Sequence, residues 1–386
     1  MVSRAAAAPH TAQVPERPSS APAAARPSNR LVAIDALRVA LIVLVVAHHA
    51  GQAYGPGGGG QAGGLWPVSD PAKAAILSSF FSVNAAFFMG LFFLIGALFM
   101  PASYDRKGPA VFLADRFVRL GLPLVVVLLI GELAASASGS SSLVGLLALF
   151  SIGRGYPGHL WFLEHLLLYA VLYTAWRLAT ARWRLPSLPV PNNAAIVASV
   201  LALAAVTFVV RIEYPINRWV YVFGVLSAEV GHLPQYASLV VVGLLAARGR
   251  WFERLPTRRG LGWLGVGLAA ALARYLLPIG TPGGANVGSL IWSTCEAFIA
   301  SGLCLGLPVL FRDSVTSGGR WLGRAAAATY GVYLVHLFVV LALQLALLGL
   351  VAPALLKFAL VTVVAVLVSF GLAAGLRRLP GVRRVL

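Results

Sequence analysis

Residues 31–52 read LVAIDALRVALIVLVVAHHAGQ, an apolar run that contains four ionisable side chains, Asp35, Arg38, His48 and His49. A helix of this length covers roughly 30 Å, the thickness of the hydrocarbon core of a bilayer. Backbone amides in lipid must be satisfied within their own segment, so the run is predicted to be a transmembrane helix. The residues LIVLVV within it show no alternation of period two, which argues against a membrane barrel.

Similar runs recur along the rest of the chain. Only 11% of the 386 residues are charged, against roughly 25% in soluble domains, and the mean hydropathy is +0.85. The pattern predicts an all-α, polytopic membrane helix bundle of about ten transmembrane helices. The expected spans are 31–52, 78–100, 117–136, 159–177, 193–211, 233–248, 260–277, 288–311, 328–350 and 353–376. Residues 1–29, rich in Ala, Pro and Ser, are expected to be a disordered cytoplasmic tail before a transmembrane domain at 30–386. A short apolar run near 143–150 is expected to be re-entrant or interfacial.

The basic residues are unevenly distributed about these spans. With ten crossings, 23 of the 30 Lys and Arg residues fall on one side of the membrane. The positive-inside rule makes that side cytoplasmic and places both termini there. The net charge of +18 is therefore assigned to topology and to contact with anionic membrane lipid, not to nucleic-acid binding. The expected location is the cell inner (plasma) membrane.

Ionisable residues inside a span are costly and suggest function. His49 follows Arg38 by eleven residues, which returns to within roughly 20° of the same helix face, and Asp35 falls on that side too. His48 is turned away by about 80°. The spacing predicts one polar stripe of Asp35, Arg38 and His49. A purely structural role, with Asp35 paired to Arg38 and the histidines bonded to neighbouring helices, stays possible at this point.

Five segments resemble the acyltransferase 3 family of membrane acyltransferases. Residues 34–49 (IDALRVALIVLVVAHH) resemble its first helix, in which an arginine and a histidine are separated by ten residues. The other similar segments are 87–96 (FFMGLFFLIG) with 104–108 (YDRKG) and 112–123 (FLADRFVRLGLP), 159–169 (HLWFLEHLLLY), 233–243 (LPQYASLVVVG) and 329–336 (TYGVYLVH). Ile95 stands where the family often has Ser, and His48 is an additional histidine. The expected architecture is the transmembrane acyltransferase unit alone, without an appended hydrolase-like domain.

The resemblance implies transfer of an acyl group, acetyl or succinyl, from cytoplasmic acyl-CoA as co-substrate. The acceptor would be a hydroxyl of an exported carbohydrate or lipid-linked molecule of the cell envelope. The general base is expected to be His49, because histidine has a pKa near operating pH. Arg38 is expected to pair with donor phosphates or to stabilise the oxyanion, and Asp35 to hold Arg38.

The resemblance also suggests substrate-binding residues: Glu164, Trp161, Arg116, Arg119 and His336. For the two arginines a role in topology is an equal alternative, and for Glu164 a bond between helices. A bonded core histidine is the stronger reading of His336. No metal site and no bound cofactor are predicted. The alternative to an acyltransferase is a transporter or exporter that uses the buried Asp-Arg-His stripe.

Overall fold

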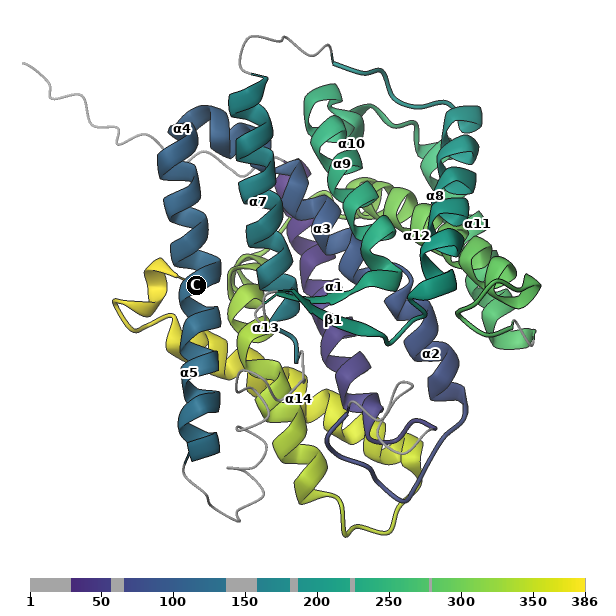
Figure 1. Cartoon of the computed structure of the whole chain (residues 1–386). Helices are drawn as coiled ribbons and strands as arrows, with labels where there is room; N and C mark the ends of the chain where they lie inside the picture. Colours follow the sequence, from purple (N-terminus) through teal and green to yellow (C-terminus); the bar gives the residue numbers. More distant parts are fainter. Residues whose placement is uncertain are drawn as a thin grey trace, which may run out of the picture.

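The computed structural model describes residues 29–56, 66–136, 158–180, 187–222, 226–277 and 280–385. The expected N-terminal tail and the short run at 143–150 lie outside these residues. Within them the chain forms a bundle of helices with one small hairpin (Figure 1). The helices are α1 (Asn29–Gln52), α2 (Ile76–Ala85), α3 (Phe88–Leu98), α4 (Met100–Arg116), the π-helix η1 (Phe117–Gly121), α5 (Leu122–Ser136), α7 (Trp161–Ala179), α8 (Asn193–Glu213), the 3-10 turn η2 (Val230–His232), α9 (Leu233–Gly249), α10 (Trp251–Arg254), α11 (Thr257–Leu276), α12 (Val287–Ser314), α13 (Arg320–Ala346), α14 (Ala354–Leu376) and the 3-10 turn η3 (Val382–Arg384).

Eight helical segments of the described chain are long and apolar enough to cross a membrane. They are Val32–Gln52, Ile76–Leu98, Met100–Ala134, Asn193–Glu213, Val230–Gly249, Val287–Ser314, Arg320–Ala346 and Ala354–Leu376. Helices α7 and α11, of 19 and 20 residues, run among them (Figure 1). The fold is therefore the expected all-α polytopic bundle, and the protein is a multi-pass membrane protein.

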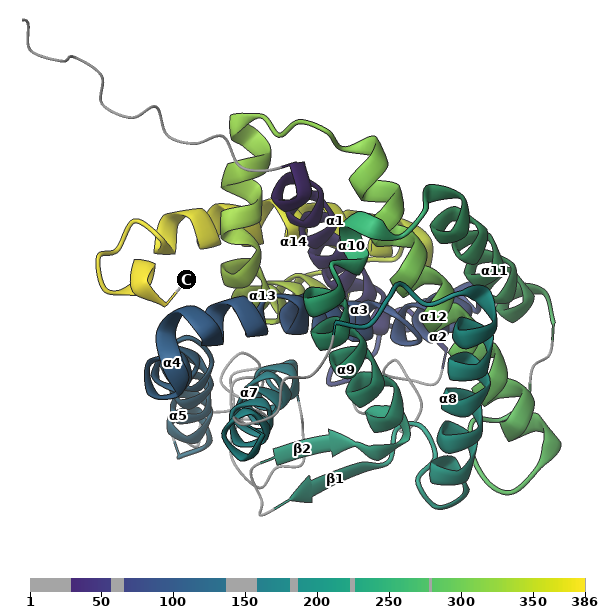
Figure 2. The ribbon, with the colours of Figure 1, turned by 90° about the horizontal axis from the view of Figure 1, so that it is seen from above.

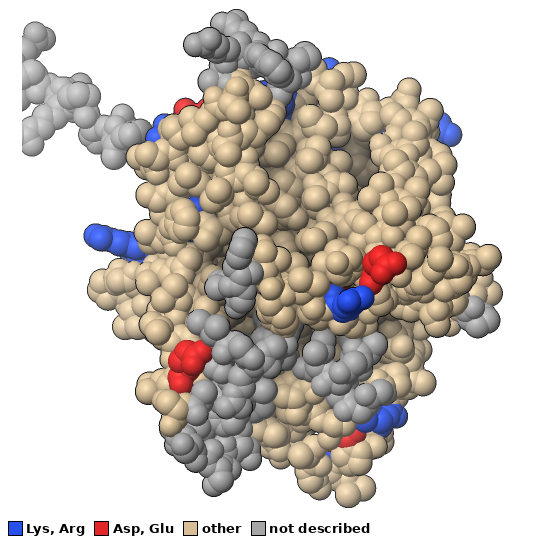
Figure 3. All heavy atoms as spheres, in the orientation of Figure 1, with Lys and Arg blue, Asp and Glu red and all other residues tan. Residues whose placement is uncertain are grey.

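The outward-facing surface is apolar. Leu129, Leu133 and Val209 are each more than 60% exposed, and the face in Figure 3 is largely uncharged, with scattered Lys, Arg, Asp and Glu. A soluble monomer rarely exposes apolar surface on this scale. This surface suits contact with lipid chains.

Three of the expected spans differ in detail. The span expected at 78–100 is two helices, α2 and α3, which meet at Phe87 with φ −143°; there the amide nitrogen of Gln235 donates to the Ala86 carbonyl at 2.7 Å. The span expected at 117–136 continues a helix that starts at Met100 and is kinked at Gly108, whose φ is +74°. The ninth span begins at Arg320 rather than 328.

A β-hairpin, which the sequence pattern did not predict, follows α8. Strands β1 (Trp219–Val222) and β2 (Leu226–Glu229) pair antiparallel, with Trp219 opposite Glu229. The residues WVYV of β1 are aromatic or β-branched, which favours a strand. In Figure 2 the hairpin lies beside α7 and α9, so its ends reach the bundle where α7 and α9 begin.

Helix α1 lies in the middle of the bundle and packs against α13, α12 and α14 (Figures 1 and 2). Helices α11 and α12 approach closely where Gly267 meets Gly302, since a Cβ on Gly267 would lie 2.9 Å from the Leu303 nitrogen. Helices α1 and α13 begin at Asn29 and Arg320, and we call this end of the bundle the basic end. The other end, at Gln52, is called the opposite end.

Candidate active site

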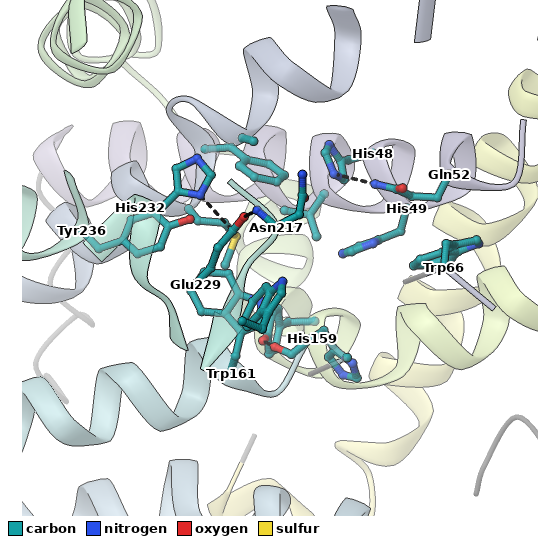
Figure 4. Close-up of a pocket in the computed structure, with 17 residues that line it drawn as sticks. His48, His49, Gln52, Trp66, His159, Trp161, Asn217, Glu229, His232 and Tyr236 are labelled. Atoms are coloured by element: carbon teal, nitrogen blue, oxygen red, sulfur yellow. Dashed lines mark hydrogen bonds and ion pairs between the residues drawn. The ribbon is translucent and has the colours of Figure 1, made fainter. Parts of the chain in front are cut away.

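A cavity of about 130 Å³ lies at the opposite end of α1, around His49 (Figure 4). It is lined from α1, α2, α3, α7, α9, α13 and the hairpin. The lining residues are Val45, His48, His49, Gln52, Trp66, Ala85, Phe88, Met89, Gly158, His159, Trp161, Asn217, Trp219, Glu229, His232, Tyr236 and Tyr333. The cavity thus combines imidazole, carboxylate and amide groups with aromatic walls.

The His49 ring points into this cavity (Figure 4). It stacks on Trp66, with ring centres 5.3 Å apart and planes at 15°. The Trp66 indole donates to Gln344 at 2.9 Å, and the Gln344 amide donates to the His49 carbonyl at 3.1 Å. Among the described residues His49 Nδ1 has no hydrogen-bond partner. Its ring is thus held by stacking and its backbone by Gln344, while Nδ1 is left without a bond to any group of the described chain.

The segment that carries Trp66 is held to the end of α1. The Asp70 nitrogen donates to the Ala53 carbonyl at 3.1 Å, and the Lys73 ammonium donates to the same oxygen at 2.9 Å. The Asp70 carboxylate pairs with Lys357 of α14 at 2.8 Å, and both side chains are about 1% exposed. The wall over His49 is therefore fixed by a buried ion pair.

Two further histidines lie behind His49. The His336 ring centre is 5.3 Å from that of His49 and 5.3 Å from that of His159. His336 Nδ1 is 2.7 Å from the Tyr333 carbonyl and must donate to it, since a carbonyl only accepts. This leaves His336 Nε2 unprotonated in the neutral ring, and in the described chain it has no partner. The three rings form a buried row of groups able to hold a proton.

His48 lines the same cavity, although its helical position turns it from the stripe. Its Nε2 is 3.0 Å from the Gln52 amide nitrogen, and its ring lies 5.2 Å from that of Phe81. A position off the stripe does not keep His48 out of the cavity, because the cavity is wider than one face of α1. Its Nε2, however, is engaged by Gln52.

A charged network forms the far wall. His232 Nδ1 lies 2.8 Å from Glu229, and His232 Nε2 lies 3.3 Å from Glu296. Arg211 is fully buried, and two of its guanidinium nitrogens donate to the Glu296 carboxylate at 2.5 and 3.1 Å. Burial alone would raise the pKa of Glu229, but His232 and the Asn217 N–H at 2.7 Å hold the pKa of that carboxyl below its ordinary value. Glu229 thus presents an ionised acceptor at the cavity.

A second cavity, of about 470 Å³, lies toward the basic end. Its size falls within the range of small-molecule sites, roughly 300–1,000 Å³. Six arginine or tyrosine side chains give it its polar character, namely Arg38, Arg116, Arg119, Tyr330, Tyr333 and Arg377. Arg38 is 3.4 Å from Asp35 and donates to Thr329 of α13 at 3.1 Å. Asp35 therefore lies at ion-pair distance from Arg38, and the Arg38 guanidinium also lines the cavity.

Tyr333 lines both cavities. Its side chain is 6% exposed and its hydroxyl donates to the His159 carbonyl. The arginine-lined cavity and the His49 cavity are therefore neighbours across one phenol ring.

One of the comparisons with known proteins identifies a family. A family model described as an acyltransferase domain matches residues 31–374, nearly the whole chain. The chain belongs to the acyltransferase 3 family. It is thus a membrane acyltransferase that transfers groups other than aminoacyl groups, from an acyl donor to a hydroxyl acceptor. Searches of curated proteins and of solved structures found no match.

The structure distributes the predicted site residues of this acyltransferase over the two cavities. Arg116 and Arg119 join Arg38 in the cavity at the basic end, and Trp161 joins His49 in the other. Arg38 and His49 also face the same helix, α13, as their spacing predicts. The two cavities place Arg38 away from His49, however, so the oxyanion role considered for Arg38 has no geometric support.

The other two predicted residues have bonded positions. Glu164 accepts the Ser227 N–H of β2 at 2.7 Å, and therefore anchors the hairpin to α7. His336 is held by its own helix yet stands next to His49. The family membership favours the acyltransferase over the transporter alternative. Within the described chain, no cluster of three His, Cys, Asp or Glu side chains could hold a metal ion.

Sequence reasoning did not identify Asn217, Glu229 and Trp66 as part of the site. Glu229 and His232 are three residues apart just before α9, a spacing that would have signalled a bonded pair. Trp66 lies in a connection and gave no signal, because its stacking partner His49 is seventeen residues away in sequence.

Proposed function

We propose that this protein moves an acetyl group, or alternatively a succinyl group, from cytoplasmic acyl-CoA to a hydroxyl of an exported carbohydrate or lipid-linked acceptor. The observation that carries the proposal is the pair of cavities that share Tyr333. One is arginine-lined and lies at the basic end, and the other contains His49, whose Nδ1 has no hydrogen-bond partner in the described part of the chain. A donor and an acceptor can therefore approach one point from opposite ends of the bundle.

On the donor side, Arg38, Arg116 and Arg119 supply guanidinium groups for the phosphates of coenzyme A. Arg116 also lies 5.1 Å above the Phe112 ring, a contact that limits its rotamers. The positive-inside rule supports a cytoplasmic position for this end, where acyl-CoA is present. The thioester arm would then extend past Phe162 toward Tyr333, since both line the cavity.

On the acceptor side, His49 serves as the general base. The acceptor hydroxyl oxygen bonds to the thioester carbonyl carbon as its proton passes to His49, the carbon–sulfur bond breaks, and the proton then passes to the departing thiolate. The products are an ester and coenzyme A. His336, beside His49, positions the base and shares its buried polar row.

Sidedness tests the proposal directly. Inside-out membrane vesicles should label an enclosed envelope saccharide from radiolabelled acetyl-CoA, because the basic end then faces the donor. Sealed right-side-out vesicles should give no labelling until detergent opens them. Equal labelling of both kinds of sealed vesicle would refute the proposed path through the bundle.

Arg38→Gln should raise the KM for acetyl-CoA by about 10- to 100-fold, since a hydrogen bond to a charged group contributes roughly 1.5–3 kcal/mol. The kcat at saturating donor should change much less, because Arg38 is not at the His49 cavity. Initial rates at varied acetyl-CoA measure both. Arg254→Gln, an exposed position at the basic end outside the cavity, is the matched control. If only the KM for the acceptor rose, Arg38 would bind the acceptor and not the acyl-CoA donor, and its proposed role would be wrong.

A further inference from the structure

A third cavity, of about 200 Å³, adjoins the His49 cavity. The two share Ala85, Asn217 and His232, so a molecule in one can extend into the other. The third cavity continues between α2, α11 and α12 at the opposite end of the bundle. Its remaining lining includes Ser82, Arg274, Trp292 and Glu296. None of these residues is used by the proposed acyl-transfer step.

Arg274 is the unusual feature of this cavity. It is 7% exposed, and its guanidinium lies 3.4 Å from the centre of the Trp292 ring. One terminal nitrogen donates to the Ser82 hydroxyl, whereas Nη1 has no hydrogen-bond partner in the described chain. The Trp292 indole N–H is also buried without a partner there. Arg274 also interacts with the Cys295 side chain, yet its Nη1 and the Trp292 N–H meet at one cavity as two buried donors without a hydrogen-bond partner in the described chain.

The nearby Glu296 carboxylate attracts the Arg274 charge, but among the described residues it makes no direct ion pair with it. Both oxygens of Glu296 are engaged by Arg211, and one of them also lies 3.3 Å from His232. No ion pair between Arg274 and a carboxylate forms within the described residues. Arg211 and Arg274 therefore face the same carboxylate with different outcomes, one fully paired and one not. A buried cation that lacks a direct ion pair is costly, and an anionic ligand would lower that cost.

We propose that this cavity binds an anionic group of the acceptor, a phosphate or a carboxylate, through Arg274 and the Trp292 N–H. The inference rests on the proposed function and deepens it, because it names the acceptor class as a negatively charged saccharide. The guanidinium suits either oxyanion, since it donates in a planar fork. With the anion held there, a hydroxyl of the same molecule reaches His49 past Asn217 and His232.

Thermal unfolding tests the site without any acyl donor. The full chain is placed in phosphatidylcholine nanodiscs and titrated with sodium pyrophosphate, D-glucuronate or, as an uncharged control, glucose. Saturating anion should raise the Tm by about 2 °C or more, and glucose should not. The rise should be lost in Arg274→Gln, reduced in Trp292→Phe and partly kept in Arg274→Lys. Arg218→Gln, an exposed arginine at the same end, should leave it unchanged.

Three results would overturn the assignment. The first is an anion-induced rise in Tm that is undiminished in both Arg274→Gln and Trp292→Phe. The second is an equal rise in Tm with glucose. The third is a rise in Tm on adding phosphatidylglycerol that blocks the effect of the anions. The last would make the occupant a lipid headgroup. A response to pyrophosphate alone would assign a phosphate, and one to glucuronate alone a carboxylate, and either supports the proposal. If anions bind as expected but acetyl-CoA donates no acyl group, the proposed function fails and the anion site stands.

Discussion

His49→Ala should lower kcat/KM for acyl transfer from acetyl-CoA by about 10²- to 10⁴-fold, the contribution of a positioned general base. Among the described residues His49 Nδ1 has no hydrogen-bond partner, and the cavity supplies space for the acceptor beside the ring. Radiolabelled acetyl incorporation into saccharide measures the loss, after expression and membrane insertion have been checked against the wild type.

His48→Ala is the matched control, because it removes the adjacent imidazole from the same helix and the same cavity. We expect a much smaller loss, since His48 Nε2 is engaged by Gln52 at 3.0 Å. If His48→Ala inactivates the enzyme and His49→Ala does not, the base is His48. His336→Gln should fall between the two, because it changes the support of His49 and not the base itself.

Lys357→Met should lower the free energy of unfolding by about 3–5 kcal/mol, since it leaves the Asp70 carboxylate buried without its counter-charge. Both partners are about 1% exposed, at 2.8 Å from each other. Chemical or thermal unfolding in detergent measures the change. The same variant should lose activity, because Asp70 belongs to the segment that stacks Trp66 on His49.

The double variant Asp70→Asn/Lys357→Met separates charge from packing. Asparagine retains an oxygen for the Ala72 N–H, which the Asp70 carboxylate accepts at 2.8 Å. With both charges gone, most of the lost stability should return, because replacing a buried ion pair is often close to neutral. A double variant as unstable as Lys357→Met alone would show that the ammonium acts through packing rather than through charge.

The spans were predictable because bilayer thickness fixes their length and apolar composition is local. The expected 193–211 and 353–376 match α8 and α14 within two residues. The break after α2 was not predictable from the sequence, because Gln235, 149 residues later, donates to the carbonyl that the break exposes. The partners of a helix break are tertiary, and no local pattern identifies them.

The candidate site, too, was predictable where local spacing decides it and not where tertiary contacts do. The eleven-residue spacing placed Arg38 and His49 on one face of α1, and both do contact α13. The pairing of Arg211 with Glu296 joins residues 85 positions apart, and was visible only as two costly side chains in separate spans. His48 shows the limit of helix-face reasoning, which gives the direction of a side chain but not the width of the space it enters.

Tyr333 has a consequence for the membrane itself. A cell membrane holds a voltage, and one elementary charge crossing 100 mV changes in free energy by about 2.3 kcal/mol. Cavities that approach each other from the two ends of a bundle would short-circuit that voltage if water joined them. The buried phenol, bonded to the His159 carbonyl, stands between the two cavities, where it would keep water from joining them. Under the proposed function, a neutral acetyl group would pass such a barrier at a lower electrostatic cost than a succinyl group, whose free carboxylate is charged.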